Sequence, residues 1–417
     1  MLNSTSVSEQ YEQAGKSGLR VLVTGAGMAG LTVAQLLRGQ GVHPVLIERH
    51  GNEGIGGYML ALMPMVDRAL DELRVRGHYR ENSEPLARYR VYSHAGRELR
   101  EDPMAGILGR YGDYRGISRG ELVETLTATG CHAAFGTTVA GIRETDAAVE
   151  VTLNEGGAMA TLEFDVVIVA EGIGSSTRDL LLPAGKVGAV DTGWGGWVVW
   201  ADQDHDTDLG DELWGAGFFL GVYPVKGQLG VFLGGAREDT AAGPADFVAR
   251  VRNKLPSMSA RADRVLSAVA DEPDPFYWPL KDCRAERWAF GRTVLLGDAA
   301  AGFLPTAGIG AGMAIESAWV LARILGHADR HNVPTLLQAY EQAQRPRVEA
   351  AQNNSRQLAS LMFRQSKLLA IVRDFIVRVM SVEMAVKSIQ RLLVDEPDPD
   401  AVARAALKAA QSDAVRS

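Results

Sequence analysis

Cysteine is scarce in this sequence: its 417 residues include only Cys131 and Cys283. Two isolated cysteines provide neither a disulfide framework nor a paired set of metal ligands. The histidines add no metal site, because His327 and His331 have the spacing of ligands on a helix but lack a third ligand nearby. We therefore predict no metal site and expect the reducing conditions of the cytoplasm.

Long apolar runs and an excess of positive charge are also absent. No run approaches the roughly 20 residues that cross a bilayer, and residues 1–18 lack the pattern of a secretory signal. The formal net charge of −8 disfavours a nucleic-acid partner, because an acidic surface repels phosphate. Ser175 and Ser176 lie in no Gly-x-Ser-x-Gly turn, so a serine hydrolase is not expected. These absences predict a cytoplasmic protein with no membrane span.

Glycine, in contrast, is concentrated in one early motif. A buried strand leads into a tight turn with Gly25, Gly27 and Gly30, and a helix is predicted from about Ala29. The first glycine permits the turn, the second lets a pyrophosphate approach bare backbone, and the third lets the helix pack on the strand. The free N–H groups around Met28 and the helix dipole then favour an anion. The motif predicts a dinucleotide-binding site.

A second strand, 43–48, ends on Glu48, followed by Arg49. An acidic residue about 20 positions after the glycines accepts hydrogen bonds from a ribose diol. A carboxylate there repels a 2′-phosphate, so the nucleotide is expected to be FAD or NAD.

Two later segments repeat the pattern of a strand followed by a turn. Residues 166–170 are continuously apolar, which is typical of a strand covered on both faces. They lead into Glu171, Gly172, Ser175 and Arg178. After another buried strand at 293–296 come Gly297, Asp298, Pro305, Gly308, Gly310 and Ala311, with a helix predicted from about Met313.

The segment between these motifs has a different character. Residues 186–284 are rich in Trp, Gly and alternating apolar positions, with helices predicted near 244–253 and 261–270. We predict an α/β protein divided as follows: a Rossmann-like nucleotide-binding domain at 19–185 and 285–345, an inserted β-sheet substrate domain at 186–284, and a C-terminal helical region at 346–417. Within that region, the apolar spacing of 368–380 predicts core or dimer packing, with a membrane-surface helix as the alternative.

The three motifs together resemble the single-component, class A FAD-dependent aromatic monooxygenases, which have the para-hydroxybenzoate hydroxylase fold. The resemblance covers residues 19–345. It implies that the Rossmann-like domain binds FAD. Two positions depart from the family: Glu171 replaces the usual Asp, and Ala301 stands where His is frequent.

The resemblance also implies site residues. Asp298 would hold the ribityl chain, Arg119 would contact the FAD, and Gly56-Gly57 would pass near the isoalloxazine. A helix start after Gly308 would face the flavin N1–C2=O edge, where reduced flavin is negative. The predicted cofactor-binding residues are Gly25, Gly27, Met28, Ala29, Gly30, Glu48, Arg49, Arg119, Asp298, Pro305, Gly308, Gly310 and Ala311.

The activity implied by the resemblance is that of a monooxygenase. NADPH or NADH reduces the FAD, and one atom of O2 enters a small molecule through a flavin C4a-hydroperoxide. Hydroxylation is expected, with epoxidation and Baeyer–Villiger insertion as alternatives. The apolar and aromatic content of 186–284 favours a bulky aromatic or polyketide-like substrate, with Tyr58, Trp200 and Tyr223 as candidate contacts. No catalytic side chain is predicted, because the cofactor carries the chemistry.

Other functions remain open on sequence. An FAD-dependent reductase or dehydrogenase would form its product without consuming O2, and a non-catalytic flavin-binding protein would shield a pathway intermediate. A flavin-dependent halogenase is disfavoured because its Trp-x-Trp-x-Ile-Pro motif is absent. The chain is expected to act as a monomer or homodimer.

Overall fold

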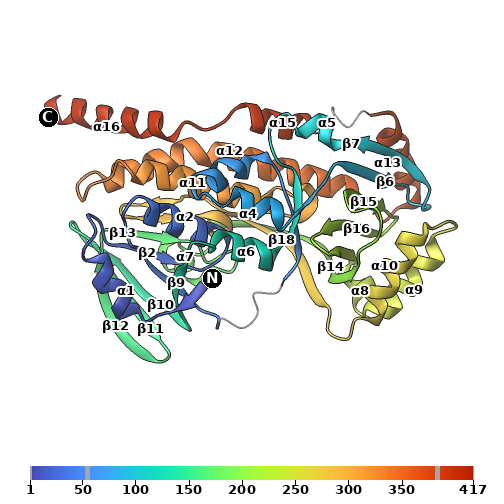
Figure 1. Cartoon of the computed structure of the whole chain (residues 1–417), viewed down its shortest axis with the longest axis horizontal. Helices are drawn as coiled ribbons and strands as arrows, with labels where there is room; N and C mark the ends of the chain where they lie inside the picture. Colours follow the sequence, from blue (N-terminus) through green and yellow to red (C-terminus); the bar gives the residue numbers. More distant parts are fainter. Residues whose placement is uncertain (1, 52–56, 381–385, 417) are drawn as a thin grey trace.

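A computed structural model describes residues 2–51, 57–380 and 386–416. Two large β-sheets, one in each half of the molecule, organise the chain (Figure 1). The α/β fold class predicted from sequence is confirmed. The predicted domain boundaries stay a prediction.

The first sheet has seven strands and lies in the half that contains the N-terminus (Figure 1). All its neighbouring strands are parallel except the last pair, β20 and β19. The strand order is β1 (Leu2–Ser4), β9 (Cys131–Phe135), β3 (Val45–Glu48), β2 (Val21–Thr24), β13 (Val166–Val169), β20 (Thr293–Leu295) and β19 (Ala289–Phe290). Strands β2 and β13 are fully buried, as their continuous apolar runs predict.

Helices α2 (Met28–Gly39) and α11 (Gly310–Leu325) pack against each other beside this sheet. The N-terminal segment, residues 2–18, belongs to the same half of the molecule. It forms helix α1 (Val7–Ala14), capped by Ser6, and also strand β1, which the sequence did not reveal.

The second sheet has eight strands and fills the opposite half of the molecule. Its order is β21 (Ala301–Gly302), β18 (Phe276–Ala285), β14 (Val187–Asp202), β17 (Gln228–Ala236), β16 (Phe218–Val225), β15 (Leu209–Trp214), β6 (Arg88–Tyr92) and β7 (Glu98–Pro103). Strands β6 and β7 form a hairpin, and β6 pairs in parallel with β15. They extend the sheet with strands from outside 186–284. The predicted helices in that range are confirmed as α9 (Pro244–Lys254) and α10 (Ala260–Asp271).

Two smaller sheets and several short helices complete the two halves. One small sheet has the order β10 (Thr137–Glu144), β11 (Val149–Glu155) and β12 (Ala158–Phe164), and the other β4 (Met59–Leu62), β8 (Arg115–Ser118) and β5 (Glu84–Pro85). The short helices are η1 (Pro64–Val66), α3 (Asp67–Glu72), α4 (Arg76–Glu81), α5 (Met104–Leu108), α6 (Arg119–Leu126), α7 (Ser176–Leu181), α8 (Arg237–Thr240), η2 (Gly297–Ala299) and η3 (Pro305–Ala307).

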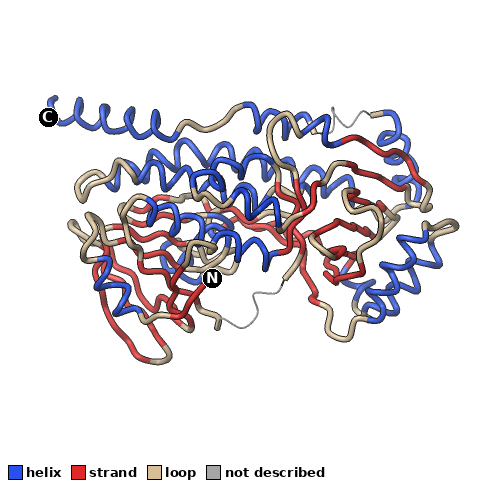
Figure 2. The backbone as a smooth tube through the Cα atoms, viewed as in Figure 1, coloured by secondary structure: helices blue, strands red, loops and turns tan. Residues whose placement is uncertain are grey.

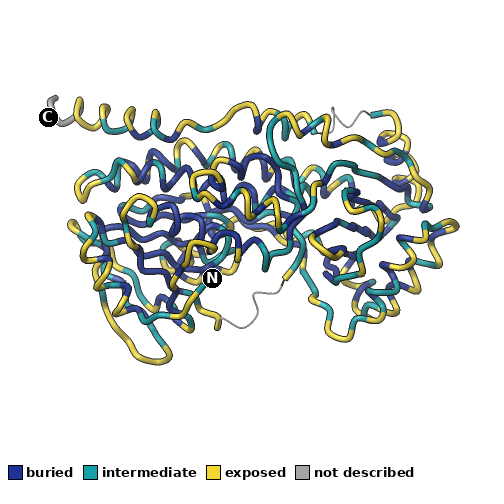
Figure 3. The backbone as a smooth tube through the Cα atoms, viewed as in Figure 1, coloured by how far each residue is buried: buried dark blue, intermediate teal, exposed yellow. Residues whose placement is uncertain are grey.

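The C-terminal region is helical, as predicted (Figure 2). Helix α12 (Val333–Met362) runs along both halves, and α13 (Lys367–Val379), α15 (Lys387–Val394) and α16 (Pro399–Arg416) follow. Burial is deepest in the sheets and in α2 and α11, whereas α16 is largely exposed (Figure 3). Within this chain, 368–380 does not pack into the core as one part of the prediction stated, because most apolar side chains of α13 are exposed. Dimer packing of this segment stays a prediction. None of the helices in the described ranges has both the length and the apolar character needed to cross a membrane.

Candidate active site

One large cavity, with a volume of about 820 Å³, is lined by residues from both large sheets. This volume lies in the upper part of the roughly 300–1,000 Å³ range of ligand pockets. Every predicted cofactor-binding residue except Gly30 lines this cavity. The motifs that are far apart in sequence are thus brought to one site.

The glycine-rich turn has the geometry that its sequence predicts. Gly25 has a φ of +96°, and a Cβ atom at this position would lie 2.5 Å from the carbonyl oxygen of Ala170. A Cβ at Gly30 would lie 1.9 Å from the carbonyl oxygen of Gly25, so this glycine does bring α2 close to the turn. A Cβ at Gly27 would meet nothing within 4 Å, because that backbone faces the cavity. The first two constraints stabilise the fold, whereas the third leaves room for a ligand.

The start of α2 and the end of β3 form one wall of the cavity. Gly27 is the N-cap and has no side chain to satisfy the first N–H groups of the helix. The Glu48 carboxylate accepts hydrogen bonds from the backbone N–H groups of Ala26, at 2.8 Å, and His50, at 3.0 Å. This carboxylate is therefore fixed beside the glycine turn, where a ribose would follow a bound pyrophosphate.

The turn after β20 packs directly on the start of α2. Gly297 has a φ of +61°, and a Cβ there would lie 2.8 Å from the Cβ of Ala29. The next residue, Asp298, lines the cavity, and its carboxylate makes no hydrogen bond or ion pair within the described part of the chain. The side chain is exposed to the cavity, but the dense protein around it reduces the solvation of the carboxylate and raises the pKa of Asp298 to about 6. A deeply placed acceptor without a partner is available for ligand hydroxyls.

The second motif supports this turn from behind. The Glu171 carboxylate accepts hydrogen bonds from the Ser175 hydroxyl and from the backbone N–H and hydroxyl of Thr177, so it stabilises the start of α7. Arg178 is buried and its guanidinium donates to the carbonyl oxygen of Ala299 at 3.4 Å. Glu171 and Arg178 therefore have separate partners and form no ion pair with each other within the described residues.

A second helix start faces the same cavity. Gly308 has a φ of +59° at the end of η3, and α11 begins at Gly310 without a side-chain cap, three residues earlier than the sequence predicted. Pro305 begins η3. The uncapped N–H groups of α11 provide a positive helix end at the cavity wall.

Arg119 and Tyr58 complete this part of the cavity. The backbone N–H of Arg119 donates to the carbonyl oxygen of Tyr58 at 3.0 Å, and a Cβ at Gly57 would lie 2.9 Å from the Arg119 Cδ. The Tyr58 ring packs on Trp278 with 4.8 Å between centroids. Burial, and secondarily the Asp298 charge, raises the pKa of Tyr58, whereas Arg119 lowers it. Gly56, which the resemblance also placed here, lies outside the described residues.

The opposite wall carries a buried carboxylate that sequence analysis missed. Glu212 on β15 accepts hydrogen bonds from the Tyr223 hydroxyl, from the Tyr89 hydroxyl at 2.5 Å and from the Trp214 indole N–H at 2.7 Å. All four residues line the cavity. Among the described residues, Glu212 forms no ion pair with Lys, Arg or His, and no cation contributes to the shift of its pKa. Three neutral donors thus replace the cation that usually accompanies a buried carboxylate.

Burial dominates the electrostatics of this cluster. It raises the pKa of Glu212, and the hydrogen bonds from Tyr223, Tyr89 and Trp214 oppose that shift. The pKa values of Tyr89 and Tyr223 lie well above the ordinary value, first because of burial and then because of the Glu212 charge. Since an indole N–H can only donate, Glu212 acts as a hydrogen-bond acceptor, and it can accept further donors from the cavity.

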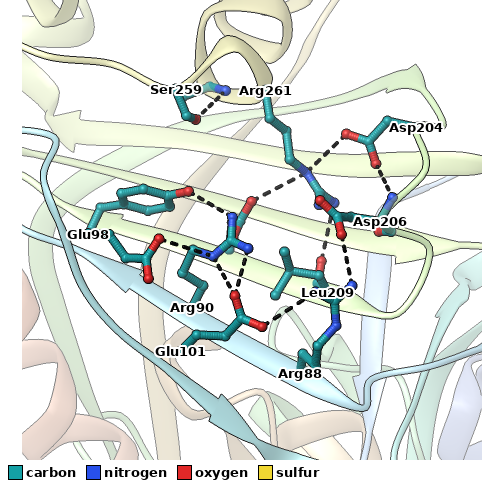
Figure 4. A network of polar contacts seen from close by, with 12 residues as sticks. Arg88, Arg90, Glu98, Glu101, Asp204, Asp206, Leu209, Ser259 and Arg261 are labelled. Carbon is teal, nitrogen blue, oxygen red and sulfur yellow. Dashed lines mark hydrogen bonds and ion pairs between the residues drawn. The ribbon is translucent and has the colours of Figure 1, made fainter.

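An ionic network on the other face of the same strands fixes this cluster (Figure 4). Successive side chains of a strand alternate between faces, so Asp211 points away from the cavity that its neighbour Glu212 lines. Arg261 lies 3.3 Å from Asp211 and 3.5 Å from Asp204. Arg90 binds Glu101 at 2.6 Å. The network ties β6, β7, β15 and α10 together, and with them the strands that carry Tyr89 and Glu212.

Of the three predicted substrate contacts, the structure places two in the cavity. Tyr58 and Tyr223 line it, but Trp200 does not. Val198 is the β14 residue that lines the cavity, and Trp200 lies two residues farther along the strand. The indole rings in the wall are those of Trp214 and Trp278.

Comparison with known proteins identifies the family of the chain. Residues 18–355 match the family of FAD binding domains. The chain belongs to this family. The 2-heptyl-3-hydroxy-4(1H)-quinolone synthase of Pseudomonas aeruginosa is 30% identical to this flavoprotein over 353 residues, which cover 78% of this chain and 85% of the relative. The salicylate hydroxylase of Pseudomonas putida is 26% identical, with 82% of this chain and 85% of that protein covered.

A solved structure agrees with the fold of the flavoprotein. The Klebsiella pneumoniae HpxO complex with FAD and uric acid superposes with a TM-score of 0.80 at 21% identity, and 91% of this chain and 97% of that chain are covered. The family and its relatives make the chain a class A FAD-dependent monooxygenase.

The cavity of the flavoprotein fits FAD. Open backbone at Gly27 suits the pyrophosphate, and the unpartnered Asp298 carboxylate suits the ribityl hydroxyls. The two uncapped helix starts, of α2 and α11, provide two positive ends for a long anionic cofactor.

Proposed function

We propose that this monooxygenase hydroxylates a bulky aromatic compound that is neutral and donates a hydrogen bond to Glu212. The observation that carries the proposal is the buried Glu212 carboxylate, which has neutral donors and no ion-pair partner among the described residues, in the cavity that also holds the FAD-binding turns. Bound FAD supplies electron transfer from NAD(P)H and the activation of O2. Epoxidation and Baeyer–Villiger insertion are alternatives at the same site.

The side chains of the protein have three roles in this proposal. Gly27 and Asp298, with the helix starts beside them, bind the cofactor. Glu212 orients the substrate by accepting its N–H or O–H, while Tyr89 and Tyr223 fix the carboxylate. The remaining wall is mainly apolar and excludes water from the reacting carbon. The apolar side chains concerned are Val198, Phe219, Phe232, Leu280, Met362 and Phe363.

The charge of Glu212 favours one class of substrate over another. A substrate carboxylate would meet a second carboxylate in a buried site, where like charges repel strongly. A ring N–H or phenol would instead add a donor to an acceptor that has capacity left. The proposal therefore favours neutral heterocycles such as quinolones, which the name of the P. aeruginosa relative includes, over carboxylated rings such as salicylate.

The test is substrate-dependent consumption of NADPH or NADH and of O2 by the FAD-loaded chain. We expect neutral quinolones to accelerate both and to give a product with one added oxygen atom, and we expect salicylate to have little effect. Acceleration by carboxylated rings alone would refute the assignment of Glu212. Product formation without O2 uptake would instead favour a reductase, and flavin reduction that no aromatic compound accelerates would favour a non-catalytic flavoprotein.

The surroundings of the enzyme belong to the same proposal. The scarce cysteines, which are both free and buried, suit the reducing cytoplasm. We propose a monomer or homodimer there, with a small aromatic molecule and O2 as its reaction partners.

A further inference from the structure

Helix α13 is inverted relative to an ordinary surface helix. Its inner face contains the charged pair Arg373 and Asp374 together with Ala370 and Val377, and all four are buried. Its outer face is apolar. A surface helix normally turns its apolar side inward and its charges to water, so the orientation of α13 needs an explanation.

The buried charges hold the helix in this orientation. The Arg373 guanidinium donates to the carbonyl oxygens of Gly215, at 3.2 Å, and Met362, at 3.4 Å, and also to that of Trp214. Asp374 accepts from the backbone N–H of His94 at 2.9 Å and lies 2.5 Å from the His94 ring. Turning the helix to bury its apolar face would break these contacts, so the apolar face stays outside.

The exposed face is the main apolar surface of the described chain. Thirteen large hydrophobic side chains are exposed in the described part of the chain, and seven of them lie on α13. The most exposed are Leu368 at 71%, Phe375 at 69% and Val379 at 68%. The other four are Leu369, Ile371, Val372 and Ile376. We call these seven residues the α13 face. An exposed patch of this kind marks an interaction surface.

The charges around the α13 face indicate the partner. Arg364, Lys367 and Arg378 are exposed beside it, whereas Asp374, the only acidic residue in 364–380, is buried. Acidic side chains of the adjacent β7 are already paired: Glu98 and Glu101 both contact Arg90. Basic side chains therefore form a rim at the two ends of the apolar face, in a chain whose net charge is −8.

We propose that the α13 face docks on an anionic lipid surface. Apolar side chains would enter the boundary between headgroups and acyl chains while the basic rim contacts anionic headgroups. A symmetric pair of chains explains the face less well, because a two-fold contact places the same patch on both sides and would bring the cations of the two rims together. This inference does not depend on which substrate the enzyme uses.

Docking would bring the active-site cavity to the membrane surface. Val377 and Met380, at the inner side of α13, line the cavity, as do Met362 and Phe363 at the end of α12. A single helix therefore separates the cavity from the surface that we assign to lipid. An apolar aromatic substrate dissolved in the bilayer would have only this short distance to travel.

The test is co-sedimentation of the full, FAD-loaded chain with vesicles. One set contains phosphatidylcholine alone and the other contains phosphatidylcholine mixed with phosphatidylglycerol. We expect clear binding to the anionic vesicles and weak binding to the neutral ones. Phe375→Ser should abolish most of the binding, and Arg378→Gln should weaken it about fivefold on anionic vesicles only.

Phe276→Ser is the matched control, because Phe276 is 59% exposed on β18 and lies outside the α13 face. It should bind as the unsubstituted chain does. The flavin spectrum and thermal midpoint establish that each variant is folded, and Leu368→Ser repeats the test of the apolar face if Phe375→Ser does not fold. Absence of binding to anionic vesicles, or binding that these α13 variants leave unchanged, would overturn the proposal. A dimer in solution that Phe375→Ser dissociates would assign the face to a second copy instead.

Discussion

Replacing Glu212 by Gln changes the charge of the substrate wall with little change in shape. The Gln oxygen can keep the hydrogen bonds from Tyr89 and Trp214, and the Tyr223 hydroxyl can turn to accept from the new NH2 group. Hydrogen bonds to a charged group contribute about 1.5–3 kcal/mol and neutral ones about 0.5–1.5 kcal/mol. A substrate that donates to Glu212 therefore loses about 1–2 kcal/mol, or roughly five- to thirtyfold in kcat/KM.

The assay compares 4-hydroxyquinoline with salicylate as probes. Binding is followed by the change in the flavin spectrum, and turnover by NAD(P)H oxidation. Glu212→Gln should weaken the binding and turnover of 4-hydroxyquinoline. It should strengthen the binding of salicylate, because the repulsion between the two carboxylates is removed. Glu98→Gln makes the same chemical change at an exposed position on β7 and should alter neither. Equal effects on both probes, or no effect on either, would refute the reasoning.

Three further predictions concern the cofactor wall and α13. Gly30→Ala places a methyl group against the Gly25 carbonyl and should lower the free energy of unfolding of the cofactor-free chain in urea by about 1–3 kcal/mol. Gly27→Ala should leave that free energy unchanged and should weaken the binding of FAD. Hydroxyls of bound FAD should lower the pKa of Asp298 from the value of about 6 in the free chain. Because the free chain then holds the proton more tightly than the FAD complex, titrations should show FAD affinity falling up to tenfold per pH unit below pH 6. Asp298→Asn should bind FAD weakly and without this pH dependence. Asp374→Asn leaves the buried Arg373 without its carboxylate partner and should lower the free energy of unfolding in urea by about 3–5 kcal/mol. Asp179→Asn makes the same change at an exposed position, and a loss for Asp374→Asn no larger than for this control would contradict the role of the Arg373–Asp374 pair.

The FAD-binding half was predictable because its constraints are local. Gly25 is required by its positive φ and Gly30 by its close approach to the Gly25 carbonyl, so their spacing reveals the strand, turn and helix. Strand β1 was missed because a strand of only three residues, two of them polar, gives no periodic signal. Its pairing partner β9 lies more than a hundred positions away in the sequence.

The substrate half depends on contacts that sequence does not reveal. A Glu in a strand, such as Glu212, is ordinarily read as facing water, and its donor Tyr89 lies 123 residues away. Alternation along β14 places Trp200 on the same face as Val198, which lines the cavity. How far the cavity extends along that face depends on the neighbouring strands, so the sequence could not show that Trp200 lies beyond it. For α13, helical spacing located the apolar face correctly, while the inward direction was wrong because Arg373 has acceptors at the distant end of β15.

The measurement that tests the central claim most directly is the FAD content of the purified chain, read from its absorbance spectrum. If Gly27 and Asp298 face one cavity, the chain should hold a single FAD and show the yellow flavin spectrum. Protein that is colourless, and that stays colourless after incubation with excess FAD, would contradict the account.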